Sequence, residues 1–353
     1  MSEVPGIDPE AVEAFLRGVL PELAGPPRFE LISGGRSNLS YRVSIGGRDL
    51  VLRRPPLGHV LPTAHDMGRE YRVLRALSAT EVPVPRPLAF CDDPSRIGAP
   101  FYLMEYRPGV VLDRELPPGF AETREQRRRI GLAVAETLAR LHAVDPERVG
   151  LGDFGRPEGF VERQVRRWAR QWEGNRVAPL PEVDELLRRL GRALPPSGDA
   201  AIVHGDYRLG NLALDPADPG RIAAIYDWEM STLGDPLCDL GYTLIYWTEA
   251  GEEGAGGIGG GGVGSVTAFP GFPSREELAA AYARASGREI HHLDFYRVLA
   301  LTKLAIISEG IYKRVRMGAA VGADLESIER PTPALAARAL GIADGAEDRR
   351  LRG

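Results

Sequence analysis

The chain has almost no lysine and almost no cysteine. Of its 44 lysines and arginines only Lys303 and Lys313 are lysines, so 42 are arginines. A GC-rich coding bias accounts for much of this, but any site that needs a lysine before position 303 is excluded. The two cysteines, Cys91 and Cys238, lie far apart in the sequence and match no zinc-ligand spacing. We therefore expect two buried thiols in a reducing compartment, without disulfide or thiolate metal site.

Long apolar runs and a charge excess are also missing. No uncharged apolar run reaches roughly 18 residues, and the first residues, "MSEVPGIDPE", are acidic where a signal peptide needs positive charge. We expect a cytoplasmic protein without a membrane partner. The formal net charge of −5 indicates no general attraction to nucleic acid. The 353 residues suffice for one two-lobed domain or two ordinary domains, and they do not indicate an oligomeric state.

The first part of the chain has the pattern of a small α+β lobe. Asp8 and Pro9 predict the start of a first helix. Residues 29–54 contain two glycine pairs between β-like runs and predict an antiparallel meander. A helix is expected around residues 64–77, followed by strands within 82–93 and 99–107. Strands, one inserted helix and more strands make up a lobe that ends near Arg107.

The rest of the chain is mainly helical in pattern. Helices are expected around residues 125–144, 156–175, 275–287 and 295–315, with a β-rich insert over 199–229. The glycine-rich residues 251–266 predict a loop. We divide the chain into a first lobe at 1–107, a helical lobe at 108–345 and a frayed tail at 346–353.

The string "IVHGDYRLGNLALD" carries the chemistry. Asp206 and Asn211 lie five residues apart after an apolar run, and Asp227 ends a second apolar run, "IAAIYD". A carboxylate can accept the proton of an attacking hydroxyl, and a carboxamide oxygen suits Mg²⁺. We expect two adjacent strands to bring these groups to one end and form an oxygen-rich magnesium site for phosphoryl transfer.

Three strings together, "HGDYRLGN", "IYDWE" and "GDPLCDLG", resemble the aminoglycoside phosphotransferase and choline kinase group of small-molecule kinases. The chain looks most like the kinase-like proteins related to the N-terminal domain fused to some acyl-CoA dehydrogenases. "SGGRSNLSYRV", "LVLRRPP", "REYRVLRAL" and "YLMEYRPG" extend the resemblance from about residue 29 to 320. It implies a protein-kinase-like fold of two lobes, a small antiparallel-sheet lobe and a larger, mainly helical lobe.

The same resemblance implies the cofactors and the residue roles. ATP and Mg²⁺ would be the cofactors and a small molecule with a hydroxyl group the acceptor. Asp206 would be the catalytic base, and Asn211 and Asp227 the magnesium ligands. His204 would support the loop by hydrogen bonding. Asp235 would cap a helix, and Asp239 would tether the catalytic loop.

Asp153, Phe154 and Gly155 form the tripeptide with which protein kinases hold magnesium. They precede the catalytic loop by about fifty residues, whereas the metal aspartate of this fold follows it. We therefore interpret Asp153 as a loop or helix-cap residue. The metal position falls on Asp227.

The resemblance places the nucleotide in the first lobe. The small residues of "ISGGRSNLSYRV" let backbone N–H groups approach phosphates closely. The phosphate contacts would come from Ser33, Gly34, Gly35, Ser37 and Asn38. The adenine would meet the backbone of the hinge, which is formed by Glu105, Tyr106 and Arg107.

The lysine that kinases place on their third strand is absent from this lobe. Strand alternation allows only one of Arg53 and Arg54 to face the cleft, and "LVLR" favours Arg53, which shares a face with Val51. Arginine can clamp phosphate, although it does not simply replace lysine. Glu70 is the expected ion-pair partner of Arg53, and Asp66 is the second choice.

The sequence leaves the acceptor open. The main hypothesis is an ATP-dependent kinase of a hydroxylated metabolite, with a hydroxyacyl-CoA first; the alternatives are an aminoglycoside phosphotransferase and an inactive nucleotide-binding pseudokinase. The sequence does not distinguish ATP from GTP as the donor. The helix with Arg166, Arg167 and Arg170 is interpreted first as amphipathic, with Trp168 and Trp172 inward, and second as a patch for an anionic acceptor. The acidic residues expected of an aminoglycoside site are few, namely Glu249, Glu252 and Glu253.

Overall fold

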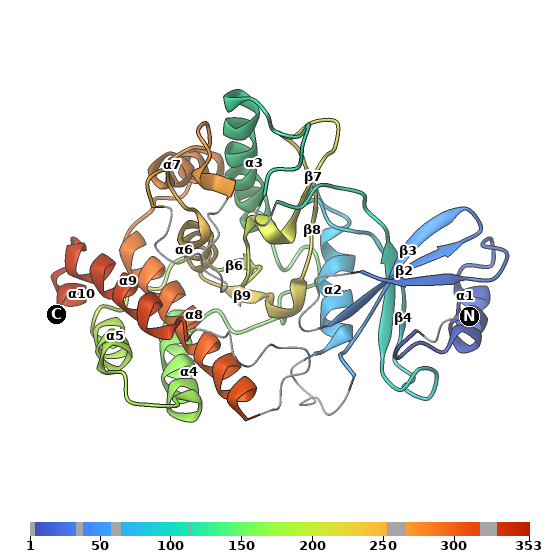
Figure 1. Cartoon of the computed structure of the whole chain (residues 1–353), viewed down its shortest axis with the longest axis horizontal. Helices are drawn as coiled ribbons and strands as arrows, with labels where there is room; N and C mark the ends of the chain where they lie inside the picture. The colour runs from blue at the N-terminus through green and yellow to red at the C-terminus, as the bar shows by residue number, and fades with distance from the viewer. Residues whose placement is uncertain (1–3, 33–37, 58–64, 113–114, 253–265, 318–329) are drawn as a thin grey trace.

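The computed structural model describes residues 4–32, 38–57, 65–112, 115–252, 266–317 and 330–353. A five-stranded sheet with two helices forms a sheet lobe, and the helices that follow form a larger helical lobe (Figure 1). The N-terminus lies at the outer end of the sheet lobe and the C-terminus at the far end of the helical lobe (Figure 1). The expected α+β fold is confirmed.

The sheet is antiparallel throughout, with the strand order β1-β2-β3-β5-β4. Its strands are β1 (Arg28–Leu31), β2 (Leu39–Ile45), β3 (Arg48–Arg54), β4 (Pro87–Cys91) and β5 (Phe101–Glu105). Gly46 and Gly47 join β2 to β3 with positive φ angles of 56° and 75°, as a two-residue hairpin with matching twist requires. The predicted meander is therefore present.

Two helices cover the two faces of the sheet. Helix α1 (Pro9–Val19) begins where the Asp8 side chain accepts two backbone N–H bonds, as predicted. It packs against the face that carries Leu50 and Leu52. Helix α2 (Met67–Leu77) lies on the other face, in the cluster that contains Val51. Because side chains alternate along β3, Arg53 follows Val51 toward the second lobe.

The helical lobe is built around the long helix α8. Its helices are α3 (Arg124–His142), α4 (Phe160–Asn175), α5 (Pro181–Arg192), α6 (Leu237–Tyr246), α7 (Arg275–Ser286), α8 (Leu293–Arg316), α9 (Thr332–Gly345) and α10 (Arg349–Arg352). The sequence did not predict α5, α9 and α10. In the part of the chain that the structure describes, no helix is long and apolar enough to cross a membrane.

The β-rich insert differs from the expectation of two adjacent strands. Strand β6 (Ala201–Val203) pairs with β9 (Thr232–Gly234), and β7 (Leu212–Leu214) pairs with β8 (Ile222–Ile225). The strand before Asp206 and the strand before Asp227 therefore belong to two separate ribbons. A hydrogen bond of 2.8 Å between His204 Nε2 and the Tyr226 carbonyl joins the ribbons instead.

The expected frayed tail is wrong. Asp348 caps α10, and Leu351 is only 1% exposed because it packs in the cluster of α5 and α9. A single leucine among charged residues shows no apolar periodicity, so the sequence offers no sign of this burial. The domain limits at 107 and 345 stay predictions.

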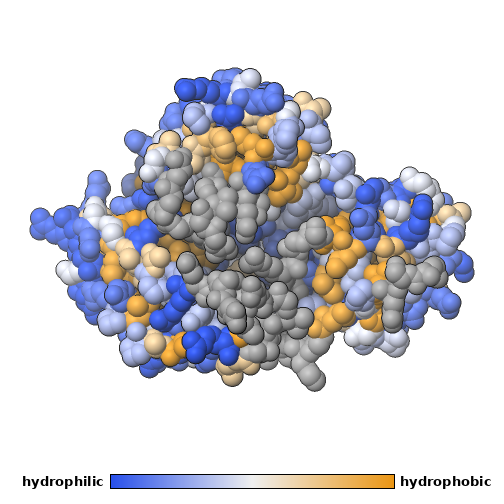
Figure 2. Space-filling model, viewed as in Figure 1, coloured by the Kyte–Doolittle hydropathy of each residue, from blue (hydrophilic) through white to orange (hydrophobic). Residues whose placement is uncertain are grey.

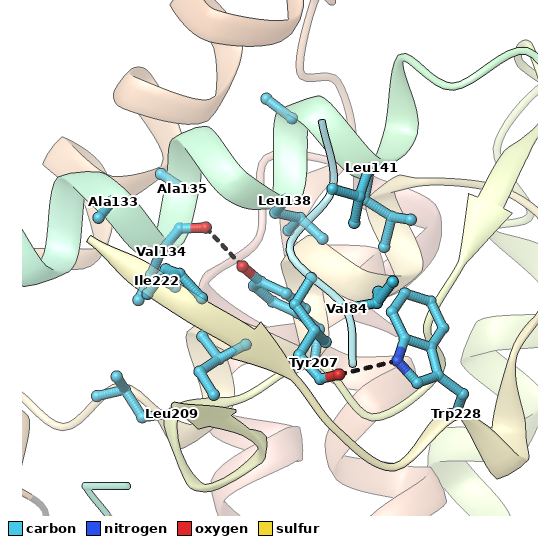
Figure 3. Packing of buried hydrophobic residues seen from close by; sticks show 14 of the residues in the cluster. Val84, Ala133, Val134, Ala135, Leu138, Leu141, Tyr207, Leu209, Ile222 and Trp228 are labelled. Atoms are coloured by element: carbon cyan, nitrogen blue, oxygen red, sulfur yellow. Dashed lines mark hydrogen bonds between the residues drawn. The ribbon is translucent and has the colours of Figure 1, made fainter. Parts of the chain in front are cut away.

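The core runs continuously from the sheet lobe into the helical lobe. Figure 3 shows helix α3 packing over the segment that carries the catalytic loop, with Val134 and Leu138 facing Tyr207. The Tyr207 hydroxyl donates to the Val134 carbonyl at 3.0 Å, and the Trp228 indole donates to the Ile225 carbonyl at the same distance. Hydrophilic residues dominate the outer rim of the face drawn in Figure 2. The core thus holds the motif segment from its buried side.

Helix α8 carries one buried and one exposed isoleucine. Replacing each by alanine distinguishes the contribution of packing to stability from that of helix propensity. Ile306 is fully buried in the cluster of α4, α5, α8 and α9, whereas Ile311 is 42% exposed. We expect Ile306→Ala to lower the free energy of unfolding by about 2–5 kcal/mol, because it leaves a cavity. Ile311→Ala should change it by about 0.5 kcal/mol or less. Urea unfolding of both variants measures the difference, and equal losses would contradict this packing.

Candidate active site

The catalytic loop brings Asp206 and Asn211 together. Gly205 adopts a φ of +84°, and a Cβ on it would lie 2.7 Å from the Met230 carbonyl, so the close approach requires glycine. The Asn211 amide nitrogen donates to the Asp206 carbonyl and to its carboxylate Oδ2, both at 2.8 Å. These bonds fix the carboxylate, and they leave the carboxamide oxygen of Asn211 available to a ligand.

Asp239 tethers this loop, as predicted. Its carboxylate accepts from the backbone N–H of His204 at 2.6 Å and of Gly205 at 2.8 Å, and it contacts His142 Nε2 at 3.2 Å. Burial alone would raise the pKa of Asp239, but the hydrogen bond and charge of His142, helped by His204, hold it below its usual value. Asp239 therefore stays ionised and keeps accepting these bonds.

The predicted support by His204 is confirmed, whereas Pro236 and not Asp235 stands at the N-cap of α6. His204 bridges to the Tyr226 carbonyl and its Nδ1 accepts from the Asp206 N–H at 3.2 Å, so it supports the loop. Asp235 accepts from the Leu237 N–H at 2.9 Å, at the start of α6. Neither side chain is placed as a metal ligand by these contacts.

Asp227 follows β8 in a strained conformation. Its φ and ψ are both 65°, in the left-handed region that a residue other than glycine adopts rarely. The preceding residue, Tyr226, donates its N–H to the Asn211 carbonyl at 2.8 Å. Asn211 and Asp227 are thus brought to neighbouring positions, and the strain lies at the residue predicted to bind the metal.

Arg53 connects the two lobes. Its Nε donates to Glu70 Oε2 at 2.8 Å, and its Nη2 donates to Asp227 Oδ1 at 2.6 Å. The Tyr102 hydroxyl also donates to Glu70, at 2.8 Å. Arg54 lies on the opposite face and binds backbone carbonyls, including that of Ile97 at 3.0 Å. Both the choice of Arg53 and its pairing with Glu70 are therefore confirmed as geometry.

Burial makes this ion pair energetically important. Glu70 is 1% exposed, and burial raises its pKa, an effect that Arg53 and the Tyr102 hydrogen bond offset in part. For Arg53, burial alone would lower the pKa, but Glu70 and Asp227 outweigh it. A buried pair of this kind is stable only while both partners are present.

Asn38 lies at the same junction and is 1% exposed. Its amide nitrogen donates to Glu70 at 2.8 Å and to Glu229 at 3.1 Å. The side-chain amide of Asn38 therefore donates to two carboxylates. The predicted contact of Asn38 with phosphate stays a prediction. The other predicted phosphate contacts, Ser33, Gly34, Gly35 and Ser37, lie outside the described residues.

The hinge follows β5. Glu105 N–H donates to the Arg86 carbonyl at 2.9 Å, and Tyr106 N–H donates to the Asp49 carbonyl at 3.4 Å. The Arg107 carbonyl accepts from the Tyr226 hydroxyl at 2.8 Å. Among the described residues no backbone acceptor is found for the Arg107 N–H. Recognition of adenine by Glu105 to Arg107 remains a prediction.

The sequence interpretation missed two cations beside the loop. Arg208 Nε lies 3.7 Å from Asp206 Oδ1, and the Lys303 ammonium donates to the Gly205 carbonyl at 2.7 Å. Arg208 was visible as a charged residue inside the motif itself. Lys303 lies on α8, almost a hundred positions later in the sequence. The only sequence feature that distinguishes it is that it is one of two lysines.

Asp153 is not part of this site. It lies in an exposed turn and binds Arg72 of α2 through both carboxylate oxygens. Phe154 is buried beneath Arg69, whose guanidinium carbon lies 3.7 Å from the ring centroid. The interpretation of Asp153 as a loop residue is confirmed.

A pocket of about 530 Å³ opens beside the catalytic loop and reaches Gly205. Its walls come from α4, α6, α8 and the segment after β8, with Phe160, Trp168, Tyr242 and Leu299 as the apolar part. The basic lining residues are Arg69, Arg156, Arg163, Arg167 and Lys303, and the acidic ones are Asp66, Glu229 and Asp239.

The charges of this pocket do not cancel. Arg69 donates to the carbonyls of Phe154 and Ser231, Arg163 to those of Glu158 and Arg156, and Lys303 to that of Gly205. The acids bind neutral N–H donors in the same way: Asp66 caps α2, Glu229 accepts from Asn38, and Asp239 holds the loop. Five basic side chains against three carboxylates therefore leave the pocket lining with a formal excess of positive charge.

The donor set at the loop suits magnesium. In the described ranges, no group of three or more His, Cys, Asp or Glu side chains could hold a metal ion. Mg²⁺ commonly takes one or two protein oxygens and fills its remaining positions with water and substrate phosphates. The Asp227 carboxylate and the Asn211 carboxamide oxygen fit this requirement.

The comparisons with known proteins agree with this geometry. The model of the phosphotransferase enzyme family matches residues 28–296. Acyl-CoA dehydrogenase family member 10 of Mus musculus is 35% identical over 333 residues, which cover 94% of this chain and 30% of the mouse protein. The chain spans less than half the length of the curated relatives it matches.

Two solved structures have the same fold. A crystal structure from Ralstonia eutropha JMP134, described provisionally as an aminoglycoside phosphotransferase, is 34% identical with a TM-score of 0.82, and the match covers 97% of this chain and 99% of that one. A thermostable mutant of aminoglycoside phosphotransferase APH(4)-Ia, in ternary complex with AMP-PNP and hygromycin B, has 17% identity and a TM-score of 0.59, with 96% and 99% covered. The second likeness shows the fold alone. The predicted two-lobed, protein-kinase-like fold is confirmed.

The buried ion pair predicts a pH-dependent loss of stability. We expect Arg53→Met to lower the free energy of unfolding by about 3–5 kcal/mol, because Glu70 loses its partner. The pKa of Glu70 then rises further in the folded state, which binds more protons than the unfolded chain, so stability falls as pH increases. The deficit against wild type should be smallest near the ordinary Glu pKa of about 4.3 and larger at neutral pH.

Urea unfolding across this pH range measures the deficit. The double variant Arg53→Met with Glu70→Gln is the matched control, because it removes the buried Glu70 charge and leaves only the partly exposed Asp227 without its arginine. It should lose the pH dependence. A deficit that is constant with pH in the single variant would mean that the Glu70 charge is not its cause.

Proposed function

The chain belongs to the phosphotransferase enzyme family, and on this basis we propose that it is an active kinase that transfers the γ-phosphate of ATP to a hydroxyl group of a small molecule. Asp206 accepts the hydroxyl proton, because Asn211 holds its carboxylate in place. Asn211 and Asp227 hold Mg²⁺. The metal supplies charge neutralisation on the phosphates when bound.

The observation that carries this proposal is the bridge from Arg53 to both Glu70 and Asp227. It places a guanidinium fork at the junction of the lobes, beside the proposed magnesium ligand and within the cleft where a nucleotide triphosphate would enter. The Nε and Nη2 of Arg53 bind Glu70 and Asp227, and its Nη1 donates to Ser40 Oγ at 3.3 Å. Arg53 would therefore orient Asp227 beside the nucleotide phosphates, and Arg208 in the catalytic loop would approach the transferring phosphate.

ATP as the donor is supported by two features. The fold relative APH(4)-Ia is in complex with AMP-PNP, an ATP analogue. The Arg107 N–H, for which no backbone acceptor is found among the described residues, would donate to the adenine ring. The preference for ATP over GTP is part of this proposal.

The acceptor is proposed to be anionic, with a hydroxyacyl-CoA as the first candidate. The pocket next to Gly205 is electropositive, and its apolar wall of Phe160, Trp168 and Leu299 suits an acyl chain. The names of the curated relatives connect them with acyl-CoA. This adds a function to the arginine-bearing face of α4, where Trp168 and Trp172 are buried and the arginines are exposed.

The aminoglycoside alternative receives less support from the contacts. A cationic acceptor needs uncompensated carboxylates, whereas Glu249 and Glu252 both bind Arg275, at 3.1 Å and closer. The hydrogen bond from Arg275 lowers the pKa of Glu252 to about 2. Neither glutamate lines the pocket, and Glu253 lies outside the described residues.

The first test is Mg²⁺-dependent transfer from ATP to hydroxyacyl-CoAs, aminoglycosides, choline and amino alcohols, measured by mass spectrometry. Asp206→Asn should lower kcat by on the order of 10²–10⁴-fold, because the base is lost while the Asn211 contact can persist. Asp153→Asn is the matched control and should retain activity, since Asp153 lies in an exposed turn. No product on any acceptor and no binding of Mg·ATP would overturn the kinase proposal in favour of a scaffold.

Two neighbouring arginines of α4, Arg166 and Arg167, allow a test of whether the acceptor is anionic or cationic. Arg167 lines the pocket, whereas Arg166 binds Glu162 at 2.5 Å on the exposed side. We expect Arg167→Gln to raise the KM of an anionic acceptor by about 3- to 10-fold, as for one partly exposed charge contact. Arg166→Gln should leave it unchanged, and neither should alter the KM of ATP. A lower acceptor KM in Arg167→Gln would instead indicate a cationic acceptor.

A further inference from the structure

Lys303 occupies a position that the mechanism above does not use. It lies on α8, lines the pocket, and donates its ammonium to the Gly205 carbonyl at 2.7 Å. The ammonium lies 4.4 Å from the centroid of the Tyr242 ring and 5.9 Å from that of Trp168. A lysine from the far end of the sequence therefore contacts the residue immediately before the proposed base.

The choice of lysine is informative in this chain. With 42 arginines and two lysines, arginine is the default cation. Two aromatic rings and a backbone carbonyl enclose the Lys303 ammonium, and a planar guanidinium is larger and carries its donors in a fixed fork. The site thus suits a compact cation with three donors, of which Gly205 takes one.

The Lys303 ammonium is buried and interacts with the negative charges of Asp206 and Asp239. Burial lowers the pKa of Lys303, while the negative charges of Asp206 and Asp239 act in the opposite direction. The ammonium is therefore poorly hydrated and near the carboxylate of the base. Poor hydration strengthens each hydrogen bond that the ammonium makes to a ligand oxygen.

We propose that Lys303 binds the acceptor, donating a hydrogen bond to an electron-rich oxygen of the acceptor next to the hydroxyl that is phosphorylated, while its bond to Gly205 holds that oxygen in register with Asp206. That the acceptor is phosphorylated rests on the proposed function. That Lys303 contacts the acceptor rests only on the geometry of the pocket. The acceptor oxygen would be a carbonyl, carboxylate or phosphate oxygen, because each accepts from an ammonium.

Lys313 is a matched control on the same helix. Its ammonium donates to the Gly174 carbonyl at 2.7 Å, which is the same kind of bond to a backbone oxygen. It lies outside the residues that line the pocket. Replacing Lys313 therefore removes an α8 lysine and its carbonyl bond without touching the catalytic loop.

The kinetic test compares Lys303→Met and Lys303→Arg with Lys313→Met, using an acceptor that the wild type phosphorylates. Losing a charged hydrogen bond should raise the acceptor KM by about 10- to 100-fold in Lys303→Met, with the KM of ATP little changed. Lys303→Arg should not restore it, because the fork does not fit. Lys313→Met should behave as wild type. Equal effects on both KM values, or full rescue by arginine, would overturn the proposal.

A second experiment on the wild-type protein needs neither turnover nor a variant. Because the chain has two lysines, reductive methylation followed by peptide mass spectrometry measures each one separately. We expect 3-hydroxybutyryl-CoA, as the probe, to slow methylation of Lys303 and to leave Lys313 unchanged. Unchanged rates at both lysines would overturn the contact. Protection without phosphate transfer to any acceptor would support the contact and count against the kinase, so the two failures are distinguishable.

Discussion

The interaction on which the site depends is the buried bridge from Arg53 to Glu70 and Asp227. One guanidinium joins β3, α2 and the segment after β8, which come from both lobes. Taking three charges out of water is costly, and the geometry compensates only because Tyr102 and Asn38 supply further hydrogen bonds to Glu70. In this lobe without lysine, Arg53 is the cation that pairs with Glu70.

The cations at the lobe junction and those in the pocket beside Gly205 have different partners. At the lobe junction the cation faces carboxylates and is compensated. In the pocket beside Gly205, Arg69, Arg163 and Lys303 face backbone carbonyls, and the basic lining residues outnumber the acidic ones by five to three. Under the proposed function, the cation at the junction holds the lobes together and the pocket selects the acceptor.

The parts of the site that the sequence predicted are those encoded within a few residues. The spacing of Asp206 and Asn211 closes one short loop, and the alternation of β3 decides between Arg53 and Arg54. Lys303 could not be predicted, because its partner is almost a hundred positions away and α8 shows no sign of the contact. Residues 33–37, four of which are predicted to contact phosphate, lie outside the described residues, so those contacts stay predictions.

By itself, the sequence determined the elements with local signals: the cap of Asp8, the glycine hairpin of the meander, and the loop that carries Asp206. Tertiary structure alone decided the pairing of β6 with β9, the burial of Leu351 and the approach of Lys303 to Gly205. The physical reason is the distance along the sequence between the interacting groups. Caps and turns are stabilised by groups a few residues apart, whereas burial and long-range hydrogen bonds depend on surfaces that exist only once the distant helices have packed.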